Sequence, residues 1–186
     1  MLPPARCFTS LLALTFVSFL CPVLSSCVDP ALNTTCRWYP DCLEAAHPCG
    51  SDGYALAYGQ HYCLAFASAN ASSLLSPEGQ LWRDTTLLCL QQQLVPLLNV
   101  TVSCKVMLLS RMSFLKRNGT NGTQDLRSYA FNSHARCYVE SGVCALSLRD
   151  WNAIRLIVCG HTVTCEGQAW QGYFWKQLAE VAASCV

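Results

Sequence analysis

Cysteine content is the feature that most limits what this chain can fold into. The 186 residues include 14 cysteines, a share typical of chains that are held together by disulfides in an oxidising compartment. Hydrophobic residues make up 52% of the chain and charged residues 12%, which excludes a disordered or collagen-like protein. The net charge of +1 excludes a nucleic-acid binder that depends on a broad basic surface.

The N-terminal segment has the order of a secretory signal peptide. It contains, in sequence, Arg6, an apolar run over 8–20, Pro22, Ser25 and Ser26. A membrane anchor is the alternative. However, the proline interrupts the run, the run is short for a spanning helix, and no basic stop-transfer cluster follows it. We therefore expect a signal peptide over 1–26, with cleavage after the first or second of the two serines.

Removal of the leader takes away Cys7 and Cys21, so 12 of the 14 cysteines remain. An even number of cysteines in an exported chain predicts that all of them pair in disulfides. No later stretch is long and apolar enough to span a bilayer. We expect a single secreted, extracellular domain over 27–186 with no membrane span.

Five Asn-x-Ser/Thr sequons agree with export and predict glycosylation at surface loops. They are Asn33, Asn70, Asn99, Asn118 and Asn121. The last two lie in the polar, Gly-rich stretch NGTNGT, which we expect to be an exposed loop. The dibasic pair Lys116-Arg117 precedes it and is either a processing site or simply a solvated pair.

Hydrophobic periodicity predicts an all-α fold, stapled by disulfides. Tyr54, Tyr58 and Tyr62 recur at helical steps, and Ser76-Pro77-Glu78 is a helix start with an N-cap, a proline and an acid. Ser147-Leu-Arg-Asp150 is a capping box for a later helix. The predicted helices cover 54–66, 76–95, 102–115, 126–142, 147–160 and 166–185. Short strands are expected only in stretches such as 95–101. Prolines and the turn sequence GSDG predict a loop-rich region over 27–53.

The cysteine order resembles that of a known family. The pattern C-x8-C-x5-C-x6-C covers Cys27–Cys49, the segment SPEGQLWRDTTLLC covers 76–89, and ARCYVESGVC covers 135–144. These motifs are similar to those of the stanniocalcins, which are secreted cysteine-rich glycoprotein hormones. The resemblance spans about Cys27 to Cys144 and depends on cysteine order and a few framework residues.

Sequence alone does not choose among the possible disulfide connectivities. The resemblance, however, implies four specific disulfides. They are Cys27–Cys42, Cys36–Cys63, Cys49–Cys104 and Cys89–Cys137. Beyond the region of resemblance, we expect Cys144 to pair with Cys185 on the C-terminal helix. Cys159 and Cys165 are then expected to close a small loop.

Two features depart from the family pattern. Stanniocalcins carry an odd cysteine that links two chains, whereas the mature count here is even, so we expect a monomer or a non-covalent homodimer. The family's longer polar C-terminal region is missing, and the cysteines at 159 and 165 are additional. The resemblance implies hormone activity, with calcium and phosphate handling or inhibition of an extracellular metalloproteinase as family roles. The target of this chain need not be the same.

No motif of a common catalytic or metal site occurs, and we predict no catalytic residue, no metal and no cofactor. His47, His61, His134 and His161 are scattered and are interpreted as packing or surface residues. His161 with the cysteines at 159 and 165 also fits a zinc site, although a disulfide fits an exported protein better. Asp41, Glu44 and Asp52 lie in one region but lack the ladder of a calcium loop.

Two families of small helical disulfide proteins offer enzymatic or lipid-binding alternatives. The segment DGYALAYGQHYC (52–63) resembles the calcium loop of secreted phospholipases A2. That chemistry needs a His-Asp pair beside adjacent cysteines, and this chain has neither. Saposin-like lipid binders use C-x-x-C pairs, which are also absent. Arg37-Trp38-Tyr39 is interpreted either as a contact patch or as packing beneath a disulfide.

The sequence therefore predicts a secreted glycoprotein that acts as a hormone, signalling ligand or inhibitor by binding an extracellular protein partner or receptor. A secreted hydrolase or lipid-active protein is the alternative from another class, and a structural matrix glycoprotein is the third.

Overall fold

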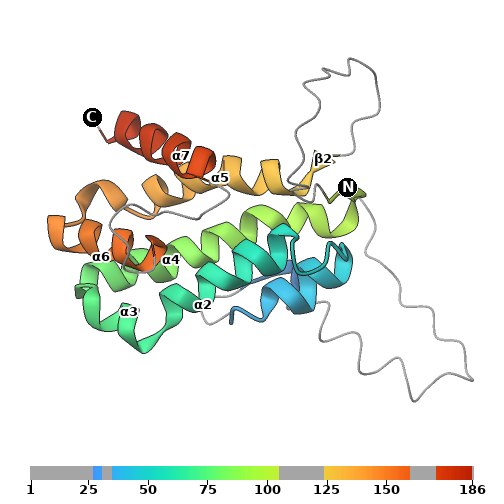
Figure 1. Ribbon diagram of the computed structural model, residues 1–186, viewed down its shortest axis with the longest axis horizontal. Helices are drawn as coiled ribbons and strands as arrows, with labels where there is room; N and C mark the ends of the chain where they lie inside the picture. Colours follow the sequence, from blue (N-terminus) through green and yellow to red (C-terminus); the bar gives the residue numbers. More distant parts are fainter. Residues whose placement is uncertain (1–26, 31–34, 105–123, 160–170, 186) are drawn as a thin grey trace, which may run out of the picture.

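Helices dominate the part of the chain that the structure, a computed structural model, describes, namely residues 27–30, 35–104, 124–159 and 171–185 (Figure 1). The predicted all-α, disulfide-stapled fold is confirmed. Strands β1 (Val102–Ser103) and β2 (Gln124–Asp125) are two residues long and pair in parallel.

The helical elements follow one another with short connections in most places. In chain order they are η2 (Tyr39–Glu44), η3 (Ala55–Gln60), α2 (His61–Ala67), α3 (Ala69–Leu74), α4 (Pro77–Leu94), η4 (Val95–Asn99), α5 (Leu126–Glu140), η5 (Val143–Ala145), α6 (Leu148–Cys159) and α7 (Gln171–Ser184). Elements η2 and η3 are π-helices, and η4 and η5 are 3₁₀ turns.

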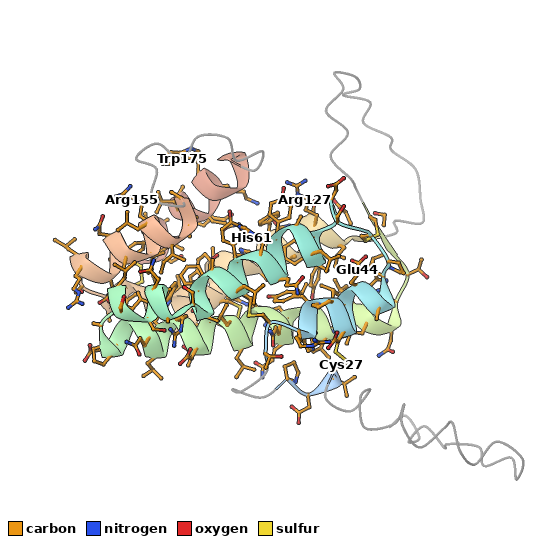
Figure 2. The ribbon with its side chains drawn as sticks, turned by 60° about the horizontal axis from the view of Figure 1, so that its bottom comes forward. Cys27, Glu44, His61, Arg127, Arg155 and Trp175 are labelled. Atoms are coloured by element: carbon orange, nitrogen blue, oxygen red, sulfur yellow. A yellow bond between two sulfur atoms is a disulfide. The ribbon has the colours of Figure 1, made fainter. Side chains whose placement is uncertain are left out.

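Helix α4 forms the centre of the molecule and runs beside α5, which in turn packs against α7 (Figure 1). Helices α2 and α3 lie on the other side of α4, and both contact α6. Figure 2 shows side chains filling the space between the helices, with Cys27 and Glu44 toward one end and Arg155 toward the other.

Local signals set the start of the two helices that meet through Asp150. Ser76 Oγ accepts the N–H of Gly79 at 3.1 Å, and Pro77 occupies the first turn of α4. Ser147 Oγ accepts the N–H of Asp150 at 3.2 Å, so the predicted cap of α6 is confirmed. A Cβ on Gly79 would lie 2.4 Å from Asp150 Oδ1. The glycine therefore lets the carboxylate enter the first turn of α4.

The N-terminal region is more helical than its prolines and turn residues predict. Residues 38–46 are helical, and Pro40 occupies the first turn of η2, a position that helices tolerate because the missing N–H has no partner there. Burial supplies the driving force, since Tyr39 is 1% and Leu43 0% exposed.

Two other segments differ from the sequence-based prediction. Residues 95–99 form a 3₁₀ turn and not a strand, because Pro96 is compatible with the first turn of a helix. Residues 102–103 form β1 and not the start of a helix, because Val102 and Ser103 pair with β2. The rest of the helix predicted over 102–115 lies outside the described residues, as does the first part of the one predicted over 166–185. The other predicted helices are present, and α5 is followed by Gly142 with φ 97°.

The buried side chains form two clusters, which we call the first and the second cluster. The first contains Trp38, Tyr39, Leu43, Tyr54, Leu94, Leu97, Leu126, Ala130 and Phe131, with Cys27, Cys36, Cys42, Ala55 and Cys63. The second contains Trp82, Ala135, Val143 and Val181. Helices α4 and α5 contribute to both clusters and thus connect them.

In five disulfides, both cysteines lie within the described residues. They are Cys27–Cys42, Cys36–Cys63, Cys49–Cys104, Cys89–Cys137 and Cys144–Cys185, with Cα–Cα distances of 5.2–5.7 Å. The first four are the pairs that the stanniocalcin resemblance implies, and the fifth is the expected pair with the C-terminal helix. Cys159 is also disulfide-bonded. Cys165 lies outside the described residues, so that pairing stays a prediction.

Candidate functional site

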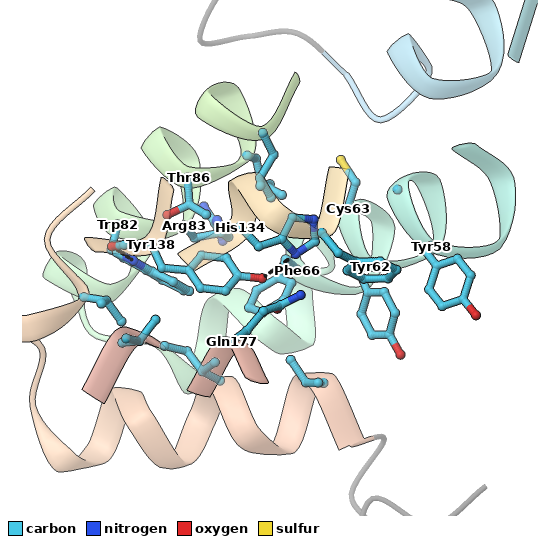
Figure 3. Close-up of a pocket in the computed structure, with 18 of the residues that line it drawn as sticks. Tyr58, Tyr62, Cys63, Phe66, Trp82, Arg83, Thr86, His134, Tyr138 and Gln177 are labelled. Atoms are coloured by element: carbon cyan, nitrogen blue, oxygen red, sulfur yellow. Dashed lines mark hydrogen bonds between the residues drawn. The ribbon is translucent and has the colours of Figure 1, made fainter. Parts of the chain in front are cut away.

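A cavity of about 130 Å³ lies where α2, α4, α5, α6 and α7 meet (Figure 3). Its walls combine residues of the first cluster, such as Tyr54 and Phe131, with residues of the second, such as Trp82 and Val181. Most of the lining is aromatic or aliphatic. The cavity therefore marks the junction at which the two clusters face each other without closing completely.

Aromatic rings form a continuous row along the wall. Neighbouring ring centroids are 5.2–6.2 Å apart, within the range of favourable ring contacts. In order, the row consists of Tyr58, Phe131, His134, Tyr138, Trp82 and Phe66. Because the rings come from η3, α2, α4 and α5, their contacts hold together four elements around one space.

His134 is the polar centre of this row. Its Nε2 lies 3.0 Å from Tyr54 Oη and its Nδ1 lies 3.1 Å from Tyr138 Oη. Desolvation lowers the pKa of His134 to about 4, and it outweighs a hydrogen bond with Gln177 that acts to raise this pKa. The imidazole is therefore neutral at physiological pH and offers one N–H donor and one acceptor. One tyrosine hydroxyl consequently accepts a hydrogen bond from the ring and the other donates one.

The tyrosines around the cavity are also held in their neutral form. Burial raises the pKa of Tyr54 well above its usual value, and Tyr138 shifts in the same direction for the same main reason. Burial, helped by the nearby Tyr58, raises the pKa of Tyr62 to about 12. The wall thus presents hydroxyl groups that donate or accept hydrogen bonds but carry no charge.

Thr86 contributes a polar atom without a partner. The residue lines the cavity and is 3% exposed, and its Oγ1 is buried with no hydrogen bond. Arg83 is the cationic residue of the lining, but it is already engaged. Its Nε lies 2.8 Å from Asp84 Oδ1, and its Nη1 donates to Ser72 Oγ at 2.7 Å.

Arg127 braces one end of the aromatic row from behind. Its Nη2 donates to Tyr58 Oη at 2.9 Å, and its guanidinium carbon lies 4.8 Å from the centroid of the same ring. Arg127 is 7% exposed, and this contact fixes Tyr58 against the first cluster.

The chemistry available at this site is binding by shape and neutral hydrogen bonds. A histidine with a pKa near 4 is a weak base at neutral pH, because its affinity for a proton is far below that of a base whose pKa lies near 7. Within the described ranges, no group of three or more His, Cys, Asp or Glu side chains lies close enough to hold a metal ion. In the same ranges, no helix is both long and apolar enough to span a membrane.

The two predicted glycosylation sites among the described residues do not line this cavity. Asn70 and Asn99 are exposed, but they lie in α3 and at the end of η4 and not in open loops. Asn33, Asn118 and Asn121 lie outside the described residues, as does the dibasic pair at 116–117. Of the paired cysteines, Cys63 lines the cavity.

The histidines and acids singled out in the sequence do not form a cluster within the described residues. His47 Nε2 lies 2.8 Å from the carbonyl oxygen of Leu97, and His61 is exposed on α2. Asp41 pairs with Arg37, whereas Glu44 accepts the N–H of Gly50 at 2.6 Å. His161 lies outside the described residues.

The segment Arg37-Trp38-Tyr39 packs in the interior for two of its three residues. Trp38 and Tyr39 are 3% and 1% exposed, and the indole N–H of Trp38 donates to the carbonyl oxygen of Cys27 at 3.1 Å. Packing beneath the disulfides is therefore the correct interpretation, and only Arg37 remains for contact with solvent.

Sequence reasoning missed the two polar features of the cavity. His134 and Tyr138 share a helical face at an i,i+4 spacing, which is a signal that the sequence does contain. Tyr54 is 80 residues from His134, and Thr86 sits on another helix. No local pattern indicates that these residues meet.

Comparison of the chain with models of known protein families, with curated proteins and with solved structures gives no match.

Proposed function

We propose that this chain is a secreted, stanniocalcin-like glycoprotein that acts by binding an extracellular protein partner. The proposal includes no catalytic step. The observation that carries it is the disulfide framework. The four pairs that the stanniocalcin resemblance implies join residues that lie next to each other in the fold. A framework of this density is typical of proteins that mature in an oxidising compartment.

Two further observations support export. The sequence begins with a segment that has the order of a signal peptide. The sequons at Asn70 and Asn99 lie at exposed positions, where an N-linked glycan would project into solvent without disturbing the core. Neither asparagine is among the residues that line the cavity.

Helix α7 is the surface that we would test first for partner binding. Trp175 on this helix is 60% exposed. Tryptophan buries a large area in a contact and is enriched among the residues that dominate binding energy. The near balance of charges leaves shape and apolar contact, more than charge steering, to determine the partner.

Export and pairing are tested by expressing the full chain in mammalian cells. We expect the protein in the medium, beginning at residue 26 or 27, with a mass that falls after enzymatic removal of N-glycans. Peptide mapping under non-reducing conditions should recover the Cys89–Cys137 pair. Retention inside the cell with reduced cysteines would contradict the proposal. A free monomer and a non-covalent dimer are distinguished by gel filtration beside a non-reducing gel.

Partner binding is tested with the secreted protein immobilised against a panel of purified extracellular proteins, including metalloproteinases whose activity is measured at the same time. We expect saturable binding that weakens about tenfold or more in Trp175→Ala, as for a central aromatic contact. Leu81→Ala is the matched control, because Leu81 is 66% exposed on α4. Incorporation into insoluble matrix without saturable binding would instead favour the matrix glycoprotein, and hydrolysis of ester substrates would favour the enzyme.

A further inference from the structure

The cavity between the two clusters has the volume of a site for a very small molecule. Its volume of about 130 Å³ is close to that of an engineered apolar protein cavity that binds benzene. Leu178 in the lining is 38% exposed and Tyr62 is half-buried. Because these lining residues also reach solvent, a molecule the size of one ring has a route into the cavity that does not require the core to unfold.

The lining offers no counter-charge to a charged ligand. Among the described residues that line the cavity none is an acid, so an ammonium group would gain no ion pair. Arg83 is the cation of the lining, and its guanidinium is engaged by Asp84 at 2.8 Å and by Ser72 at 2.7 Å. His134 is neutral at physiological pH. A charged group that entered this space would therefore lose its hydration without a replacement.

Three tyrosine hydroxyls of the lining already have hydrogen-bond partners. The hydroxyl oxygens of Tyr54 and Tyr138 lie 3.0 and 3.1 Å from the two ring nitrogens of His134. Tyr58 Oη accepts a hydrogen bond from Arg127 at 2.9 Å. A polar ligand would therefore compete with bonds that are already made, and both nitrogens of the imidazole are in use.

Thr86 and Gln177 do not change this balance. Thr86 Oγ1 is buried, so the residue contacts the cavity through its other atoms and an occupant does not reach the oxygen. The side chain of Gln177 is hydrogen-bonded to His134. Most of the other lining residues are apolar, and Leu90 and Val181 are two of them. The occupant that gains most from entry is thus one with no polar group to desolvate.

We propose that this cavity is a binding site for a small, uncharged, apolar molecule no larger than about a single ring, held by contact with the aromatic row and the aliphatic side chains around it. Burial of apolar surface supplies the affinity. For an aromatic occupant, ring contacts of the kind seen within the row add to it. The site goes beyond the function proposed above and does not depend on it, because Trp175 is not among the residues that line the cavity.

The experiment is a titration of the intact, disulfide-bonded protein with three fluorinated probes, followed by ¹⁹F NMR. Fluorobenzene is the apolar probe, 4-fluorophenol adds one hydroxyl and 4-fluorobenzoate adds a charge. We expect saturable binding of fluorobenzene. We expect 4-fluorophenol to bind at least about fivefold more weakly, because its hydroxyl loses bonds to water without gaining a free partner. The benzoate should show no saturable binding, because its charge is not compensated.

Methyl NMR and two variants connect the binding to this cavity. In the wild type, the methyl signals of Val181 and Leu90, which line the cavity, should shift when fluorobenzene is added. Those of Leu81, which is 66% exposed and lies outside the lining, should not. Val158→Phe enlarges a lining side chain at the expense of the cavity and should abolish fluorobenzene binding. Leu81→Ala is the matched control and should leave the affinity unchanged.

Any of four results would overturn the proposal. They are no saturable binding of fluorobenzene at millimolar concentration, binding of either polar probe as tight as that of fluorobenzene, methyl shifts at Leu81 as large as those at Val181, and unchanged affinity in folded Val158→Phe. Circular dichroism checks that each variant is folded. If Val158→Phe does not fold, the methyl shifts in the wild type decide the location alone. Loss of partner binding in Trp175→Ala with intact fluorobenzene binding separates this site from the function proposed above.

Discussion

Asp150 should be one of the most sensitive positions for stability, because it joins the starts of two helices. The residue is 1% exposed. Its carboxylate accepts the backbone N–H of Ser76 at 2.8 Å and the Ser76 hydroxyl at 2.9 Å. It also accepts the Ser147 hydroxyl at 2.6 Å. The aspartate of the predicted capping box is thus used to dock α6 onto α4, far beyond its local role.

The magnitude follows from these contacts. Each hydrogen bond to a charged group contributes about 1.5–3 kcal/mol net, and bonds that share one acceptor are not additive. We therefore expect Asp150→Ala to lower the free energy of unfolding by about 3–5 kcal/mol. Asp150→Asn keeps one acceptor oxygen and the shape of the side chain but removes the charge. It should cost about 1.5–3 kcal/mol.

The same residue predicts the pH dependence of stability. Burial alone would raise the pKa of Asp150. The hydrogen bonds from Ser147 and Ser76 outweigh it and hold the pKa below its usual value. A lowered pKa in the folded state means that the stabilisation is fully present above the unfolded pKa of about 3.9. It is lost as the pH falls through the folded value. The acid decline in stability should therefore be shallower in Asp150→Asn than in the wild type.

Urea unfolding followed by circular dichroism, with disulfides intact, measures both effects. The control is Asp41→Asn, since Asp41 is exposed and its ion pair with Arg37 at 3.0 Å lies within one turn. An exposed pair of this kind contributes little to stability. The reasoning fails if Asp150→Asn lowers the free energy of unfolding by less than about 1 kcal/mol. It also fails if the free energy of unfolding declines equally in both variants as the pH is lowered.

Three other substitutions test the packing and the covalent framework by the same urea measurement. Gly59→Ala should destabilise by about 1–3 kcal/mol, because its Cβ would lie 2.3 Å from ring carbons of Tyr39, and a stabilised variant would show that this contact can relax. Thr86→Val should stabilise by about 1 kcal/mol, because it removes a buried hydroxyl without a partner; a loss of stability would mean that the hydroxyl is satisfied. Replacing Cys89 and Cys137 together by alanine should cost about 2–4 kcal/mol, since the bond closes 48 residues of chain, and a smaller loss would mean that the other cross-links already restrict the unfolded chain.

The helices with clear local signals could be predicted from the sequence. Helix α4 has Ser76 as its N-cap and Pro77 in its first turn, and α5 is followed by Gly142 in a left-handed conformation. Such signals act within a few residues, so the local sequence alone determines where these helices begin and end.

The N-terminal region and the short strands could not be predicted in the same way. Prolines at 30, 40 and 48 indicate turns, yet Pro40 occupies a helix start because Tyr39 and Leu43 are buried by η3 and other distant elements. Val102 belongs to a strand because residue 124, beyond a long connection, pairs with it. In both cases tertiary contact overrides the local preference.

The candidate site could be predicted least of all. The sequence indicates a helical apolar stripe that includes Tyr54, and this residue is indeed buried. It does not indicate that the packing leaves a space, or that Thr86, His134 and its tyrosines line that space together. A cavity depends on how the side chains of several helices pack against one another, and the sequence of a single helix does not determine this packing.

The cross-links offer a physical reason why this space persists. A cavity of about 130 Å³ costs on the order of 3 kcal/mol relative to full collapse, so something must oppose the approach of its walls. Three disulfides, Cys27–Cys42, Cys36–Cys63 and Cys49–Cys104, brace the first cluster. The pair Cys144–Cys185 fixes the end of α7, and Asp150 fixes the start of α6 on α4. These links restrain helices on several sides of the space and so oppose its closure. A site maintained in this way is preorganised, and a ligand that fills it need not supply the energy to open it.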